Sequence, residues 1–145
     1  MTAKQYLQRY RELEGRYNTT LEEYKNLESD MITLKSPDLS GDRVQTSPKN
    51  DPIGEMVCQI EARKGIIGIR MLEFSNQMYL IRNQIHDIGE INSDYGSILV
   101  LRYILYKDWH FICDKLFMSR AQANIVHNKA LQEFDKQFKD SYAEK

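Results

Sequence analysis

The chain contains few of the residues that break helices and no segment long enough to cross a membrane. Its 145 residues include three prolines and seven glycines. This composition favours a mostly helical protein, with an all-α fold class. No apolar run reaches the roughly 18 residues that a membrane span requires. The first residues, MTAKQYLQRY, lack the hydrophobic core of a signal peptide. We therefore expect a soluble, cytoplasmic protein.

The chain also has few cysteines and almost no net charge. Cys58 and Cys113 are the two cysteines and form no Cys-x-x-Cys pair, so we expect free thiols in a reducing compartment and no zinc site. Net charge is −1, and any nucleic-acid binding must therefore come from a local basic patch. His86 lies near Asp87 and Glu90, but no nucleophile accompanies them. The sequence predicts no enzyme, no cofactor and no metal.

Two long stretches repeat apolar residues at alternating steps of four and three, the spacing of a helix packed lengthwise on another helix. They cover residues 1–34 and 53–92 and predict a long antiparallel helical hairpin of the coiled-coil type. The expected contact positions are Tyr6, Tyr10, Leu13, Tyr17, Thr20, Tyr24, Leu27, Met31 and Leu34, and then Ile53, Val57, Ile60, Lys64, Ile67, Met71, Phe74, Met78, Ile81, Ile85 and Ile88. We interpret the tyrosines as packing residues rather than as a ladder for stacking bases.

The second stretch contains residues that a simple hairpin does not explain. Lys64 either sets the register of the hairpin or extends toward solvent. Gly65 and Gly68 each cost about 1 kcal/mol relative to alanine, and mark either a close helix approach or a flexible point. Four apolar residues lie off the contact positions: Ile66, Ile69, Leu72 and Leu80. They predict a second contact surface, covered by the terminal helices or by another copy of the chain, and we favour a homodimer.

A linker of residues 35–52 separates the two stretches. It holds all three prolines, a glycine and several serine, aspartate and asparagine residues, which exclude regular structure. We expect a solvated loop that joins two antiparallel helices, with a phosphate contact through Arg43 or Lys49 as the alternative. At the other end of the second stretch, Gly89 is expected to end the helix, and Ser93 or Asp94 to cap the next one.

Residues 93–145 have the pattern of a helix-turn-helix unit. A helix is expected at Ser97–Tyr106, followed by a short helix Trp109–Leu116 with Asp108 as its N-cap. After a brief connection, Ser119 and Gln122 form the Ser-x-x-Gln capping box of a longer helix. This last helix is expected to continue through about residue 138, and the polar tail beyond it to fray.

These motifs, in this order, resemble those of a phage protein family. The run LRYILYKDWHFICDKLFMSRAQANIVHNKAL (residues 101–131) and the upstream DRVQTSP (residues 42–48) are similar to the RinA/ArpU-like late-gene transcriptional regulators of phages and prophages of low-GC Gram-positive bacteria. The C-terminal part of that family is similar to region four of primary sigma factors. Phe117 stands where family members usually have glycine, and Cys113 where they often have alanine. The resemblance implies a DNA-binding regulator in a bacterial host cell.

The candidate DNA-binding residues lie around the start of the last helix. The outward positions there are Arg120, Ala121, Gln122, Asn124 and, one turn on, Asn128, and side chains at such positions meet base edges in the major groove. By resemblance to sigma region four, Arg120, Ala121 and Asn124 occupy base-reading positions. The candidate phosphate contacts are Lys107, Lys115, Lys129 and Tyr103. Residues 107–131 hold four basic and two acidic side chains, so we expect few ionic contacts and a shallow salt dependence.

Trp109 and His127 are two further residues near the candidate DNA-binding surface. Trp109 is interpreted as a core residue, and His127 either as a core hydrogen-bonding residue or as a phosphate contact. The expected partner is double-stranded DNA. One alternative is a phage helical interaction protein that binds host RNA polymerase or another host protein. Another is a DNA-packaging recognition subunit, which would assemble as a ring.

Overall fold

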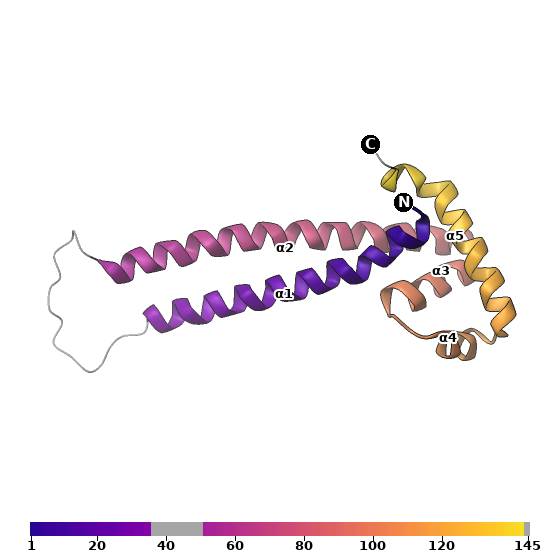
Figure 1. The fold of residues 1–145 in the computed structure, drawn as a ribbon, viewed down its shortest axis with the longest axis horizontal. Helices are drawn as coiled ribbons and strands as arrows, with labels where there is room; N and C mark the ends of the chain where they lie inside the picture. Colours follow the sequence, from indigo (N-terminus) through magenta and orange to yellow (C-terminus); the bar gives the residue numbers. More distant parts are fainter. Residues whose placement is uncertain (36–50, 144–145) are drawn as a thin grey trace. The chain divides into compact units, whose positions relative to one another are not determined.

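The computed structural model describes residues 1–35 and 51–143 (Figure 1). Its elements, in chain order, are α1 (Ala3–Lys35), α2 (Pro52–Ile91), α3 (Ser93–Leu99), the π-helix η1 (Val100–Ile104), α4 (Trp109–Leu116) and α5 (Arg120–Tyr142). No strand occurs within the described ranges, so the predicted all-α fold class is confirmed. None of the described helices combines the length and apolarity needed to span a membrane.

The chain forms two compact units, and both long helices contribute to each of them. The terminal unit comprises Met1–Gly15 and Ser75–Lys145, and the hairpin unit comprises Arg16–Phe74. Residues 36–50, including the DRVQTSP motif and the predicted contacts Arg43 and Lys49, lie outside the described residues. α2 begins at Pro52, where a missing N–H costs nothing, and Asp51 Oδ1 accepts a hydrogen bond of 2.9 Å from Gly54 N.

In the hairpin unit most of the predicted contact positions of α1 and α2 turn away from solvent, but Ile53, at the start of α2, is 55% exposed. Met31 and Ile67 are buried, and other contact positions, among them Tyr24 and Phe74, are half-buried. Lys64 Nζ lies 3.7 Å from Glu28 Oε1 and 5.1 Å from the centre of the Tyr24 ring. Lys64 therefore contacts α1, which favours a role in the register of the hairpin over extension into solvent.

The opposite face of α2 in the hairpin unit is exposed. Ile66, Ile69 and Leu72 have exposed fractions of 56%, 61% and 61%. A Cβ atom added to Gly65 or Gly68 would meet nothing within 4 Å. The two glycines therefore do not mark a close helix approach within the described chain, and the predicted second contact surface is present but uncovered there.

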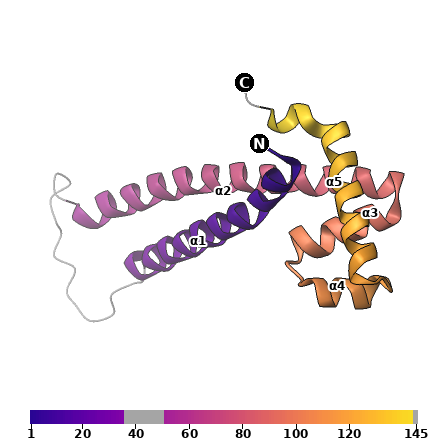
Figure 2. The same cartoon turned by 45° about the vertical axis from the view of Figure 1, so that its right-hand side comes forward.

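The terminal unit has a continuous core to which α1, α2, α3, α4 and α5 all contribute. Figures 1 and 2 show α5 crossing α3 and the start of α1 lying beside the last turns of α5. The fully buried side chains include Leu7, Tyr10, Ile81, Ile85, Ile88, Ile98, Leu99, Ile112 and Phe134. Burying each large apolar side chain contributes roughly 1.5–3 kcal/mol, and this core holds the C-terminal helices in place.

The C-terminal end of α5 is part of this core, so the prediction of a fraying tail from about residue 138 was wrong. Tyr142 is 6% exposed, and its ring stacks on Tyr6 with centroids 4.8 Å apart. Gln84, also buried, accepts a 2.8 Å hydrogen bond from the Tyr6 hydroxyl and donates one of 2.9 Å to Ser141 Oγ. These contacts are made with residues far away in sequence, and they extend the helix despite its polar composition.

Two glycines let α2 and α3 approach each other closely. A Cβ atom added to Gly96 would lie 2.5 Å from Gly89 Cα, a distance that only a backbone shift could relieve. Gly89 was predicted to end α2, but the helix continues to Ile91. Asn92 rather than Ser93 or Asp94 caps α3, with its side chain accepting from Asp94 N at 2.9 Å.

Candidate nucleic-acid interface

α4, a tight turn and α5 follow each other with the local hydrogen bonds that the sequence predicts. Asp108 Oδ1 accepts from Phe111 N at 2.8 Å, so Asp108 is the N-cap of α4. Ser119 Oγ accepts from Gln122 N at 3.1 Å and caps α5 in the same way. Each cap contributes about 1 kcal/mol to helix stability, and together they determine where the turn lies.

The turn between α4 and α5 passes through a left-handed residue. Phe117 has φ 56° and ψ 45°, and its side chain is 94% exposed. Side chains with a Cβ atom are disfavoured in this region, and here no packing of the ring offsets the cost. Glycine, which has no Cβ atom, would suit this backbone position better than phenylalanine does.

The beginning of α5 exposes one face and buries the other. Arg120, Ala121, Gln122, Asn124 and Asn128, the predicted base-reading residues, are all exposed. The opposite face packs through Ala123, His127, Ala130 and Phe134, which are buried. Ile125, which was not predicted as a site residue, is 55% exposed on the outward face. The sequence does not distinguish this isoleucine from a core residue, whereas its exposure in the folded chain does.

Trp109 is the side chain around which the cations of this surface gather. The guanidinium carbons of Arg120 and Arg102 lie 4.5 Å and 5.0 Å from the centre of its ring. Its edge meets His127, with ring centroids 4.9 Å apart. Cation–π contacts of this kind contribute about 0.5–1 kcal/mol at exposed sites. Trp109 is half-buried, so it packs as predicted and also restrains Arg120.

His127 lies in the core, which decides between its two predicted roles. It is 7% exposed, and its Nε2 shares a 2.8 Å hydrogen bond with the Tyr103 hydroxyl. Burial, together with the positive charges of Lys4, Arg102 and Arg120, lowers the pKa of His127 to about 4. His127 is thus neutral at pH 7. Tyr103, also predicted as a phosphate contact, is 5% exposed, and its hydroxyl is hydrogen-bonded to His127. Burial raises its pKa to about 12.

The same electrostatic contacts identify positive charges that the sequence did not group together. Lys4 comes from α1, Arg102 from η1 and Arg120 from α5, and all three act on the one imidazole of His127. Positive charges from outside residues 107–131 therefore act on the buried face of α5. Lys4 and Arg102 were missed because they precede that segment, and they come near His127 only through the packing of three elements.

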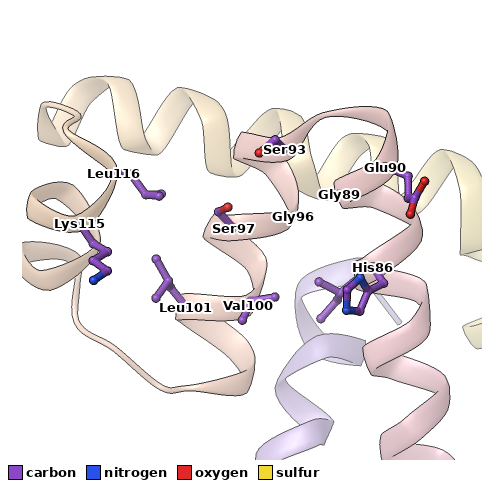
Figure 3. Close-up of a pocket in the computed structure, with 11 residues that line it drawn as sticks. His86, Gly89, Glu90, Ser93, Gly96, Ser97, Val100, Leu101, Lys115 and Leu116 are labelled. Carbon is purple, nitrogen blue, oxygen red and sulfur yellow. The ribbon is translucent and has the colours of Figure 1, made fainter.

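The three predicted phosphate-binding lysines occupy different environments. Lys107 Nζ lies 4.9 Å from the centre of the Phe111 ring, and Lys129 is exposed on α5. Lys115 is exposed as well, but it lines a separate cleft of about 650 Å³. Figure 3 shows Lys115 and Leu116 of α4 on one side of this cleft, and His86 and Glu90 of α2 on the other. Of the three lysines, Lys107 is the closest in sequence to Trp109.

The described residues contain no group of three histidine, cysteine, aspartate or glutamate side chains that could hold a metal ion. The exposed side chains around Arg120 offer guanidinium, amide and ammonium donors, which suit phosphate oxygens and base edges.

Comparison with protein-family models, curated proteins and solved structures finds no match to this chain.

Proposed function

We propose that this protein is a transcriptional regulator of a phage or prophage that reads duplex DNA with the start of α5. The observation that supports this most directly is the exposure of Arg120, Gln122 and Asn124 on a capped helix whose other face is packed. A short helix, a tight turn and a second helix with an exposed N-terminal face are the features expected of a helix-turn-helix, and they support this proposal. The resemblance to RinA/ArpU-like regulators supports the same function, in the cytoplasm of a bacterial host.

In this proposal each exposed side chain of α5 has a definite role. Arg120 pairs with the O6 and N7 atoms of a guanine, and Gln122 or Asn124 with the N6 and N7 atoms of an adenine. Ala121 and Ile125 meet thymine methyl groups. Asn128 contacts the adjoining base or backbone. Lys107, Lys129 and, farther along α4, Lys115 bind phosphates and orient the protein without reading sequence.

A mobility-shift titration with the regulatory DNA of the phage tests this reading surface. The double variant Arg120→Ala with Asn124→Ala should weaken binding at least about 30-fold, because each base contact contributes about 1–3 kcal/mol. The matched control is Arg63→Ala with Asn76→Ala, which removes the same side-chain types from exposed positions of α2. Equal affinity of the first double variant and the wild type would exclude α5 as the reading helix.

We further propose that the regulator acts as a homodimer, which presents two reading helices and compensates for a modest affinity of each. The uncovered face of α2, with Ile66, Ile69 and Leu72 more than half exposed, supports self-association. Sedimentation equilibrium should give a dimer for the wild type and a monomer for Ile69→Ser with Leu72→Ser. Met56→Ser, on another face of the same helix, is the control. A wild-type monomer at micromolar concentration would contradict the dimer.

The same exposed residues favour one other function, a helical protein that binds host RNA polymerase or another host protein. A patch of apolar side chains on a helix face is typical of a protein-interaction surface. Binding of purified host RNA polymerase that is lost in Ile69→Ser with Leu72→Ser, together with no retention of DNA at low salt, would favour this function. A DNA-packaging recognition subunit would instead show the mass of a ring in solution.

A further inference from the structure

A second, smaller cleft lies in the terminal unit. It shares Arg102 with the group of side chains around Trp109, which comprises Arg102, Arg120 and His127. It has a volume of about 320 Å³ and is lined by Gln8 and Arg11 of α1, Arg102 and Tyr103 of η1, and Tyr106. The lining side chains include two guanidinium groups and no carboxylate. Two guanidinium groups facing one cleft repel each other, and an anion bound between them would relieve this repulsion.

Neither arginine of this cleft is neutralised by a partner in the described part of the chain. Ion pairs of the described residues, such as Lys64 with Glu28 and His110 with Asp114, involve neither arginine. Arg11 lies instead over the Tyr106 ring, with its guanidinium carbon 5.1 Å from the ring centre. Arg102 Nη1 donates one hydrogen bond of 3.1 Å to the Lys107 carbonyl oxygen. A guanidinium carries five N–H donors, so both groups keep donors for a ligand.

The backbone around the cleft is irregular, and this irregularity positions the cleft residues. The predicted helix Ser97–Tyr106 was only partly right: it begins at Ser93, continues as the π-helix η1 and ends before Tyr106, which has φ 57°. π-Helical segments and left-handed non-glycine residues are frequent at functional sites. The Tyr106 hydroxyl donates to Glu14 Oε2 at 2.6 Å, which holds the strained residue under Arg11.

We propose that this cleft binds a phosphodiester group of the DNA backbone, so that α1 forms part of the DNA-binding surface. Paired guanidinium groups match the oxygens of a phosphate in geometry and charge. Arg102 connects the two sites, because it lines the cleft and shares the Trp109 ring with Arg120. A phosphate held between Arg11 and Arg102 then belongs to the same duplex that α5 reads. This inference rests on the proposed DNA-binding function.

A phosphate site and a base-reading site differ in a measurable way. Loss of a phosphate contact weakens binding to every sequence alike and lowers the salt dependence of the affinity, whereas loss of a base contact affects the specific site alone. The assignment therefore predicts that Arg11 contributes to affinity but not to sequence preference, although it lies more than 100 residues before Arg120 in the chain.

The test is a salt titration of binding to two duplexes, one with the specific site and one with a scrambled site. Arg11→Gln should weaken binding to both about fivefold and reduce the slope of log affinity against log salt by about 0.9. Arg9→Gln is the matched control, because it removes the same charge from an exposed position of α1 outside this cleft. Arg102→Gln should behave like Arg11→Gln, with melting curves to verify that this half-buried variant folds.

Three outcomes separate this inference from the function on which it rests. If the wild type binds the specific duplex and Arg11→Gln matches it in affinity and slope, the cleft assignment is wrong and the DNA-binding function stands. If Arg9→Gln and Arg11→Gln weaken binding equally, the effect is one of net charge and the cleft is again not the site. If the wild type binds neither duplex at low salt, the proposed function itself is overturned.

Discussion

The terminal unit and the hairpin unit share the same two long helices, but they cover those helices to different extents. In the terminal unit Ile81, Gln84, Ile85 and Ile88 of α2 are at most 4% exposed. In the hairpin unit Ile67 is the one buried residue of α2, and Ile66, Ile69 and Leu72 are all more than half exposed. A single partner helix covers one face of α2, and the C-terminal helices cover more. The hairpin unit thus leaves a continuous apolar face of α2 exposed, whereas the terminal unit buries a wider face of the same helix and exposes apolar side chains such as Leu80 and Ile125 singly.

The first prediction contrasts one glycine from each unit. Gly96→Ala places a Cβ atom 2.5 Å from Gly89 Cα and should destabilise the protein by about 3 kcal/mol, the upper range for overpacking. Gly65→Ala adds a Cβ atom that meets nothing within 4 Å and should stabilise it by up to about 1 kcal/mol through helix propensity. Urea denaturation measures both. Equal effects of the two substitutions would mean that the close approach of α2 and α3 is absent in solution.

The second prediction concerns pH, because all three histidines lie in the terminal unit. The pKa of His127 is about 4 in the folded protein and ordinarily 6.5, so the unfolded chain binds more protons between these values. Stability from a neutral His127 is therefore complete above pH 6.5 and declines as the pH falls toward 4, by at most about 3 kcal/mol.

The fluorescence of the single tryptophan, Trp109, offers a direct measurement, since its ring contacts His127. Urea midpoints from this signal should fall with decreasing pH in the wild type and change less in His127→Gln. His110→Gln is the control, because the His110 side chain is 89% exposed and should leave the profile unchanged. A wild-type profile identical to that of His127→Gln would show that His127 is not neutral and buried.

The smallest effect is expected at the two left-handed residues, both of which lie in the terminal unit. Phe117→Gly should stabilise the protein by about 1 kcal/mol, because glycine removes the cost of the positive φ and a ring that is 94% exposed contributes no packing. Tyr106→Gly should not stabilise it, since its hydroxyl bonds to Glu14 and its ring lies under Arg11. Thermal melts of the two variants give the change in melting temperature. We expect an increase for Phe117→Gly, where no contact offsets the backbone strain, and no increase for Tyr106→Gly, where contacts offset it.

Local signals in the sequence were sufficient for much of the candidate site. The caps Asp108 and Ser119, the helix Trp109–Leu116 and the exposed residues of α5 were predicted correctly, because each depends on neighbours within four positions. The long-range features were not predicted. Arg102 and Lys4 come near the His127 ring, as Arg120 does, only through the packing of η1, α1 and α5. Tyr142 is buried only because Tyr6 lies against it, and Gly89 is a contact residue only because Gly96 faces it.

The sequence by itself determined that this protein is helical, where its two long helices lie and where the turn before α5 occurs. These features follow from the periodicity of apolar residues and from capping side chains, which act within one or two helical turns. Tertiary structure alone decided which charges meet, which tyrosines are buried and where the backbone departs from the α-helix at Val100–Ile104. Those outcomes depend on contacts between residues distant in sequence, whose proximity no local pattern encodes.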